Sequence, residues 1–82
     1  MALYVYRKEV LRALFVHGVV PTDRTPPDLP RGFVRDLYKY ELRDLRDRYV
    51  RKEFAKKEYA DRVVELRNKY PVLALIARQW VE

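Results

Sequence analysis

The sequence predicts an all-α protein, a small antiparallel three-helix bundle with a proline-rich first loop and a short C-terminal helical extension. Apolar residues recur at intervals of three and four over long stretches, which is the spacing of one helix face. Four of the five prolines fall within residues 18–30, between two such stretches. With 82 residues and no cysteine, the chain is expected to form a single helical domain over residues 1–82 without disulfides.

The first predicted helix covers about residues 2–17 and is amphipathic. Its apolar residues form two rows, Leu3, Tyr6, Val10 and Leu14 in one and Leu11 and Phe15 in the other. The polar side carries Arg7, Lys8 and Arg12, with Glu9 as its only acid. A basic amphipathic start is typical of a mitochondrial targeting helix, and also of an ordinary first core helix. The regular periodicity favours the core helix, and both interpretations hold if a targeting helix is retained.

A proline-rich loop is predicted at residues 18–30. Gly18 can adopt the left-handed conformation that ends many helices, so it is the expected end of the first helix. The four prolines that follow restrict the backbone and remove amide donors, which favours an extended connector. We interpret this loop as a stiff strap across a helix pair.

The second predicted helix, about residues 31–54, is the longest and carries most of the positive charge. Its apolar row is Val34, Tyr38, Leu42, Leu45 and Tyr49. Residues 31–58 contain ten Lys/Arg and six Asp/Glu, a net of +4 within a chain whose total is +6. Acids four residues before a base, as at Asp44–Arg48 and Asp47–Arg51, predict ion pairs of about 0.2–0.5 kcal/mol each. The helix therefore needs its apolar row to be buried by the rest of the chain.

A third helix is predicted at about residues 58–69 and a short final helix at about 71–81. The next apolar row, starting at Tyr59, is out of step with the row that precedes it, which predicts a turn or kink near residues 55–58. Tyr70 precedes Pro71 and is expected to be non-helical, whereas Pro71 suits a first helical turn. The final helix would place Leu73, Ile76 and Trp80 on one face.

The residues that most enzymes and metal sites require are scarce in this sequence. There is one histidine, His17, no cysteine, and the two glycines are Gly18 and Gly32. This composition predicts no catalytic dyad, zinc site or glycine-rich phosphate loop, so we expect a protein that is not an enzyme and binds no cofactor directly. No apolar run reaches the roughly 18–20 residues of a transmembrane helix. The excess of positive charge favours an acidic partner.

Two sequence segments resemble the LYR-motif family of small mitochondrial proteins. The first helix contains Leu3-Tyr4, Tyr6-Arg7 and Val10-Leu11-Arg12, and residues 49–54 read Tyr-Val-Arg-Lys-Glu-Phe. With Pro-Pro-Asp-Leu at residues 26–29, the chain is most similar to the branch that assists succinate dehydrogenase assembly. The opening tripeptide departs from the family pattern, because Leu3-Tyr4-Val5 lacks the arginine. A competing alignment of the opening motif starts at Leu37-Tyr38-Lys39.

The resemblance implies a partner, a location and a set of site residues. Family members bind the acylated acyl carrier protein of the mitochondrial matrix, whose acyl chain, on its phosphopantetheine arm, threads between the helices. Six basic residues would then face the carrier: Arg7, Arg12, Lys39, Arg43, Arg51 and Lys52. Three residues would line the tunnel for the acyl chain: Tyr6, Leu11 and Phe54. The chain would serve as a non-enzymatic accessory or assembly factor.

Two other functions fit parts of the sequence. Tyrosines interleaved with arginines, at Tyr38, Tyr40 and Tyr49, and the net charge of +6 favour a small RNA- or ribosome-associated protein. The apolar tail at residues 72–81 favours a structural subunit of a larger complex, such as a respiratory one. The LYR-type function overlaps with the second of these, since members of that family act both as assembly factors and as subunits.

Overall fold

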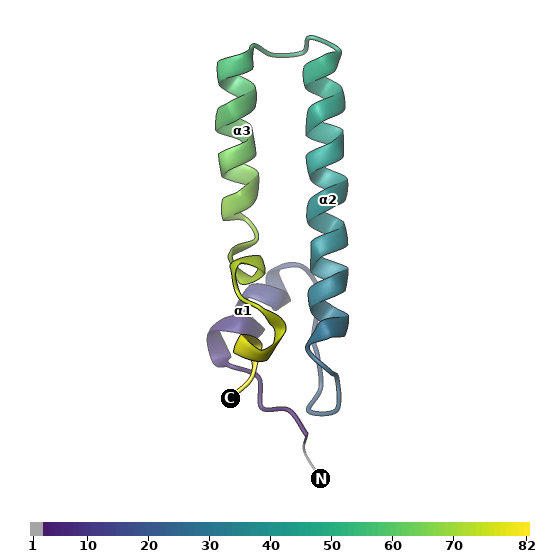
Figure 1. Cartoon of the computed structure of the whole chain (residues 1–82), viewed down its shortest axis with the longest axis vertical. Helices are drawn as coiled ribbons and strands as arrows, with labels where there is room; N and C mark the ends of the chain where they lie inside the picture. Colours follow the sequence, from purple (N-terminus) through teal and green to yellow (C-terminus); the bar gives the residue numbers. More distant parts are fainter. Residues whose placement is uncertain (1–2) are drawn as a thin grey trace.

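The computed structural model describes residues 3–82 and shows an all-α protein with three helices in that part of the chain, which confirms the predicted bundle. Its helical elements are α1 (Lys8–Val16), α2 (Asp28–Val50), α3 (Lys56–Asn68) and the 3₁₀ turns η1 (Pro71–Ala74) and η2 (Ala77–Trp80). Helices α2 and α3 run antiparallel as a long hairpin, and α1 packs with the C-terminal segment at the hairpin's open end (Figure 1). The molecule measures 53 × 18 × 16 Å. We call the turn at residues 51–55 the tip, and the opposite end, with α1, η1 and η2, the base.

The apolar core is densest at the base. Val10, Leu14, Val34 and Trp80 are the most deeply buried residues, each at most 1% exposed. The indole N–H of Trp80 donates a hydrogen bond to the carbonyl of Val72 at 3.1 Å, so the buried ring leaves no polar atom unsatisfied. Three elements, α1, α2 and η2, contribute these side chains, and they enclose the core from several directions.

The predicted apolar rows of α2 and α3 face each other along the hairpin. Leu45 and Leu66 are buried between the two helices. Other members of the two rows are partly buried against this core: Tyr38, Leu42, Tyr49, Tyr59 and Val63. Because two helices alone cannot surround a side chain, burial along the hairpin is less complete than at the base.

The predicted helix at residues 2–17 starts too early. Residues 3–7 are extended, and residue 2 lies outside the described part of the chain. Backbone hydrogen bonds of 3.0 and 2.8 Å join residues 5–7 to residues 80–82, with Tyr6 and Val81 forming an antiparallel bridge. These tertiary bonds satisfy the amide groups that a helix would otherwise use, and α1 begins only after them.

The predicted start of the second helix at residue 31 is wrong by one turn. Helix α2 begins at Asp28, and Pro30 lies within its first turn. The first amides of a helix have no partner inside it, so proline costs little there, whereas we expected it to exclude helix. Asp28 also places a negative charge at the positive end of the helix dipole. The connecting loop is therefore shorter than predicted.

Helix α1 ends as the sequence predicts. Gly18 has a φ of 75°, and its amide donates to the carbonyl of Phe15 at 2.9 Å. The amide of Val19 donates to the carbonyl of Leu14 at 3.0 Å. This pair of bonds is the Schellman arrangement, in which a left-handed residue lets the chain satisfy the last free carbonyls.

Helix α2 ends in the same arrangement without a glycine. Lys52 has a φ of 64°, its amide donates to Tyr49 at 2.9 Å, and the amide of Glu53 donates to Arg48 at 3.1 Å. The helix therefore stops at Val50, not at residue 54, and α3 begins at residue 56 instead of 58. The sequence lacks the glycine that usually signals such an end, which explains the error.

The predicted final helix at residues 71–81 is instead two 3₁₀ turns with extended residues between them. The guanidinium of Arg31 donates to the carbonyls of Leu75 at 2.9 Å and Leu73 at 3.3 Å, and so occupies acceptors that a continuous helix would need. Trp80 is fully buried while Ile76 is 48% exposed, so the predicted common face does not exist. The predicted non-helical backbone before Pro71 is confirmed.

Candidate partner-binding surface

A groove of about 490 Å³ lies between α2 and α3. It is lined by three apolar and three basic residues: Leu42, Tyr59, Val63, Lys39, Arg43 and Arg46. We call it the basic groove. The apolar residues belong to the rows that hold the hairpin together, so they form a floor, and the basic side chains rise from α2 along one edge.

Among the described residues, the cations of the basic groove form no ion pairs, although Arg43 also borders a small hollow that contains Asp44 and Asp47. Lys39, Arg43 and Arg46 follow each other at intervals of four and three, which places them on one face of α2. In the described part of the chain none of them forms an ion pair, and no carboxylate lines the groove. Positive charge that is not held in ion pairs, beside an apolar floor, favours an anionic partner with an apolar portion.

A second groove between the same helices, of about 350 Å³, has the opposite character. Acids and bases alternate along it, and its charged residues are Glu41, Asp44, Arg48, Arg62, Glu65 and Lys69. Lys69 pairs with Glu41 at 3.1 Å. Its charges largely cancel, so of the two grooves the basic one is the better candidate for binding.

Phe54 lies at the centre of the contacts that hold the tip together. Its ring is buried, and the guanidinium carbons of Arg48 and Arg62 lie 5.4 and 4.7 Å from the ring centre. Tyr49 and Tyr59 stack on each other at 4.4 Å beside it. Both arginines lie within the range of favourable cation–π contacts, so aromatic and cationic side chains hold the end of the hairpin together.

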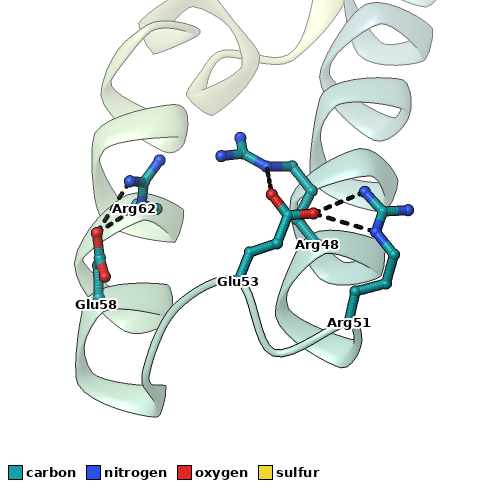
Figure 2. A network of polar contacts seen from close by, with 5 residues as sticks. All are labelled: Arg48, Arg51, Glu53, Glu58 and Arg62. Atoms are coloured by element: carbon teal, nitrogen blue, oxygen red, sulfur yellow. Dashed lines mark hydrogen bonds and ion pairs between the residues drawn. The ribbon is translucent and has the colours of Figure 1, made fainter.

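Glu53 joins two arginines across the turn, as Figure 2 shows. Its carboxylate accepts from Arg51 Nη2 at 2.9 Å and from Arg48 Nε at 3.1 Å. Hydrogen bonds from Arg51 and then Arg48 lower the pKa of Glu53. These arginines were predicted to pair with Asp47 and Asp44. That prediction is wrong, because the chain reverses direction after Val50 and presents Glu53 to both of them.

The tip adds to the charge of the basic groove. Residues 47–57, which include the tip, contain five Lys/Arg and two Asp/Glu, a net of +3. Tyr59 lines the groove and also belongs to the aromatic stack, so the two regions are continuous. We call the basic groove and the tip together the basic surface.

The structure divides the predicted partner-binding residues into two groups. Lys39 and Arg43 lie in the basic groove, and Arg51 and Lys52 lie at the tip. Arg7 and Arg12 lie at the base, immediately before and within α1. A small partner bound to the basic surface could therefore contact four of the six residues. The other two belong to the α1 segment, at the opposite end of the molecule from the tip (Figure 1).

The predicted acyl tunnel does not form from Tyr6, Leu11 and Phe54. Tyr6 is buried at the base, where its hydroxyl donates to the carbonyl of Thr25 at 2.6 Å and burial raises its pKa. Leu11 is 37% exposed on α1, whereas Phe54 is enclosed at the tip. Residues at opposite ends of a 53 Å molecule cannot line one tunnel.

Sequence reasoning missed Arg46, Arg48, Tyr59 and Arg62 as members of this surface. Arg46 could have been found, because it lies one helical turn after Arg43 on the same face. The contacts of Arg62 and Tyr59 with residues of α2 depend on where the chain reverses, and the sequence places that turn incorrectly.

Another polar cluster joins the three helices but is structural. Tyr70 donates a hydrogen bond to Glu41, and burial followed by this carboxylate raises the pKa of Tyr70 to about 12. The hydrogen bond from Tyr70, aided by Lys69, lowers the pKa of Glu41. His17 stacks on Tyr70 at 4.4 Å and its Nε2 donates to the carbonyl of Lys69 at 3.0 Å. Each group already has a partner within the protein.

Together these observations define a small helical protein with a basic, partly apolar surface that is a candidate for binding. Among residues 3–82, no set of three His, Asp or Glu side chains could hold a metal ion, and no helix is long and apolar enough to cross a membrane. The chain matches no protein-family model, no curated protein and no solved structure.

Proposed function

We propose that this protein is a non-enzymatic accessory or assembly factor of LYR type, located in the mitochondrial matrix, that binds an acidic protein on its basic surface. The observation that carries the proposal is the row of unpaired cations, Lys39, Arg43 and Arg46, beside an apolar floor. Cations that form no ion pair within the protein can bind a partner's carboxylates without breaking an internal ion pair. They also steer an acidic protein into one orientation.

The proposed partner is an acylated acyl carrier protein, and its acyl chain would lie in the basic groove. The groove offers Leu42, Tyr59 and Val63 to an apolar chain, with cations at its edge for the acidic carrier. Each buried methylene would contribute about 0.8 kcal/mol. This placement replaces the tunnel predicted from the sequence. In this role the protein would help to build or stabilise a larger mitochondrial complex.

Co-expression with a mitochondrial acyl carrier protein, followed by native mass spectrometry, tests the proposal. We expect a one-to-one complex whose mass includes the acylated phosphopantetheine arm. The double variant Arg43→Glu/Arg46→Glu should abolish it, because two attractive charges become repulsive. Arg35→Glu is the matched control, since Arg35 is an exposed arginine of α2 outside the groove. A folded chain that forms no complex at low salt would refute the proposal.

Binding to RNA is the second candidate, and the tip favours it. Six Lys/Arg lie within residues 46–57, next to the aromatic side chains of Tyr49 and Tyr59. Phosphate contacts would make the affinity for RNA fall steeply as the salt concentration rises. In a plot of the logarithm of the binding constant against the logarithm of the salt concentration, each phosphate contact adds about one unit to the negative slope. Electrophoretic mobility shifts with single-stranded and duplex RNA at two salt concentrations measure this. Absence of a salt-dependent shift would exclude the RNA function.

A further inference from the structure

The outer face of α1 combines exposed apolar and basic side chains. Lys8, Leu11, Arg12 and Phe15 follow each other at intervals of three, one and three, so they share one face of the helix. Phe15 is 71% exposed and Leu11 is 37% exposed. Val10 and Leu14 of the same helix are buried in the core, which holds this outer face towards solvent.

The charges on this outer face all have the same sign. In the described chain neither Lys8 nor Arg12 forms an ion pair. Glu9, the acid of α1, lies beside Arg12 at the edge of this face, three residues before it, and forms no ion pair with Arg12. A phenylalanine flanked by two free cations is the pattern of helices that lie in the headgroup region of an anionic membrane.

The position of Leu11 and Phe15 outside the described grooves also favours a flat partner. The described grooves have neither Leu11 nor Phe15 in their lining. A docked helix or strand of another protein needs a groove or a sheet edge, while a lipid surface accepts side chains that project from a convex one. Other apolar residues close to this face in the sequence are also exposed: Leu3, Val5, Val16 and Val20.

We propose that the base of the molecule is a membrane-contacting surface, in which Phe15 and Leu11 of α1 insert among the lipids of an anionic phospholipid bilayer while Lys8 and Arg12 contact the phosphates. The basic groove lies between α2 and α3, whereas α1 lies at the open end of the hairpin (Figure 1), so the two proposed contacts use different parts of the molecule. This contact does not depend on the function proposed for the hairpin.

Vesicle flotation of the full chain tests the proposal. We expect binding to vesicles of phosphatidylcholine mixed with phosphatidylserine, and none to phosphatidylcholine alone. Phe15→Ser should weaken binding by at least about tenfold, because an inserted aromatic ring is lost. Arg12→Glu should weaken it by more than about fivefold, since one attractive charge becomes repulsive. Circular dichroism confirms that each variant is folded.

Two control variants separate the base from the rest of the molecule. Tyr40→Ser removes an aromatic side chain that is 74% exposed in the middle of α2, and Arg67→Glu reverses an exposed charge on α3. Both should bind the anionic vesicles as the unmodified chain does. The proposal is overturned if the unmodified chain does not float with them, or if Phe15→Ser and Arg12→Glu bind as well as the controls.

The same variants also identify a different occupant. If sedimentation shows self-association that Phe15→Ser abolishes, then a second copy of the chain covers this face and the membrane proposal is wrong. Binding that persists in both α1 variants would mean that vesicles recognise the basic surface instead. A vesicle signal specific to Phe15 and Arg12 in a monomeric chain supports the proposal.

Discussion

The base and the tip each contain a helix end with the same hydrogen-bond arrangement, but different chemistry completes it. At the base, α1 ends with Gly18 at a φ of 75°, and the next residue, Val19, packs against the core. At the tip, α2 ends with Lys52 at a φ of 64°, and the next residue, Glu53, pairs with Arg48 at 3.1 Å. An apolar contact completes the first end and an ion pair completes the second.

This difference extends to the whole of each region. The base encloses fully buried side chains, among them Trp80 and Leu14, whereas the tip encloses Phe54 with arginines whose charged groups reach solvent. Burial of apolar area supplies most of the folding free energy, and exposed ion pairs supply little. The base therefore determines whether the protein folds, while the tip can carry charge for binding at small cost to stability. Five substitutions test this contrast.

The largest effect is expected at the base. Trp80→Ala should lower the free energy of unfolding by about 3–5 kcal/mol, because it removes a fully buried ring and the hydrogen bond from its indole N–H to the carbonyl of Val72. Urea denaturation followed by circular dichroism measures the change. The exposed Tyr40→Ala is the control and should remain close to the unmodified chain. A loss below about 1 kcal/mol would show that the base is not the core.

A smaller and more local effect is expected at the tip. Phe54→Ala should cost about 2 kcal/mol, below the value for the base, because the cavity opens to solvent and the arginines relax into it. Hydrogen exchange should show lost protection near residues 46–62 and unchanged protection in α1. Phe54→Leu keeps apolar volume and should recover part of the loss. Exchange that rises equally at both ends would contradict the separation between tip and base.

The Tyr70–Glu41 hydrogen bond predicts a pH-dependent difference. The lowered pKa of Glu41 contributes stability that is present above its ordinary value of 4.5 and is lost as pH falls through the folded value. The raised pKa of Tyr70 contributes stability that is present below 10.0 and is lost as pH rises towards about 12. Tyr70→Phe should therefore cost about 1 kcal/mol between these limits and less outside them.

Thermal unfolding of Tyr70→Phe and the unmodified chain across the pH range measures this effect. The stacking partner His17 is retained in the variant, so the hydrogen bond is the main loss. Tyr40→Phe, on an exposed side chain, serves as the matched control. A difference that does not change with pH would show that the hydroxyl contributes without its carboxylate partner.

The smallest effects concern the two left-handed residues themselves. Gly18→Ala should cost about 1 kcal/mol, since an added Cβ meets no atom within 4 Å and the penalty is conformational only. Lys52→Gly should raise stability by about 0.5 kcal/mol. Glycine removes the strain of a side chain at a φ of 64°, and this gain exceeds the cost of the larger conformational entropy of the unfolded chain. Denaturant midpoints of the two variants provide the comparison. The changes in stability of the two variants should have opposite signs, and changes of the same sign would contradict the interpretation.

The candidate site was only partly visible in the sequence. Lys39, Arg43, Arg51 and Lys52 were expected to bind a partner, and the structure places them on one continuous basic surface. The tunnel through Tyr6 and Phe54 was wrong, because periodicity identifies which residues are apolar but not which apolar residues meet. The pairing of Arg48 with Glu53 was missed for a related reason, since it depends on where the chain reverses.

Local physical chemistry in the sequence determined the all-α class, the apolar rows of the hairpin helices, the end of α1 at Gly18 and the non-helical backbone before Pro71. Each depends on side-chain periodicity or on the backbone preferences of glycine and proline, which act over a few residues. Tertiary structure alone decided that residues 3–7 are extended, that α2 ends at Val50, and that the C-terminal segment forms 3₁₀ turns. In two of these cases a group distant along the chain overrides the local preference: the carbonyl of Trp80 holds residues 3–7 extended, and the guanidinium of Arg31 binds the C-terminal segment. In the third case, the end of α2, the turn requires a residue with positive φ, Lys52.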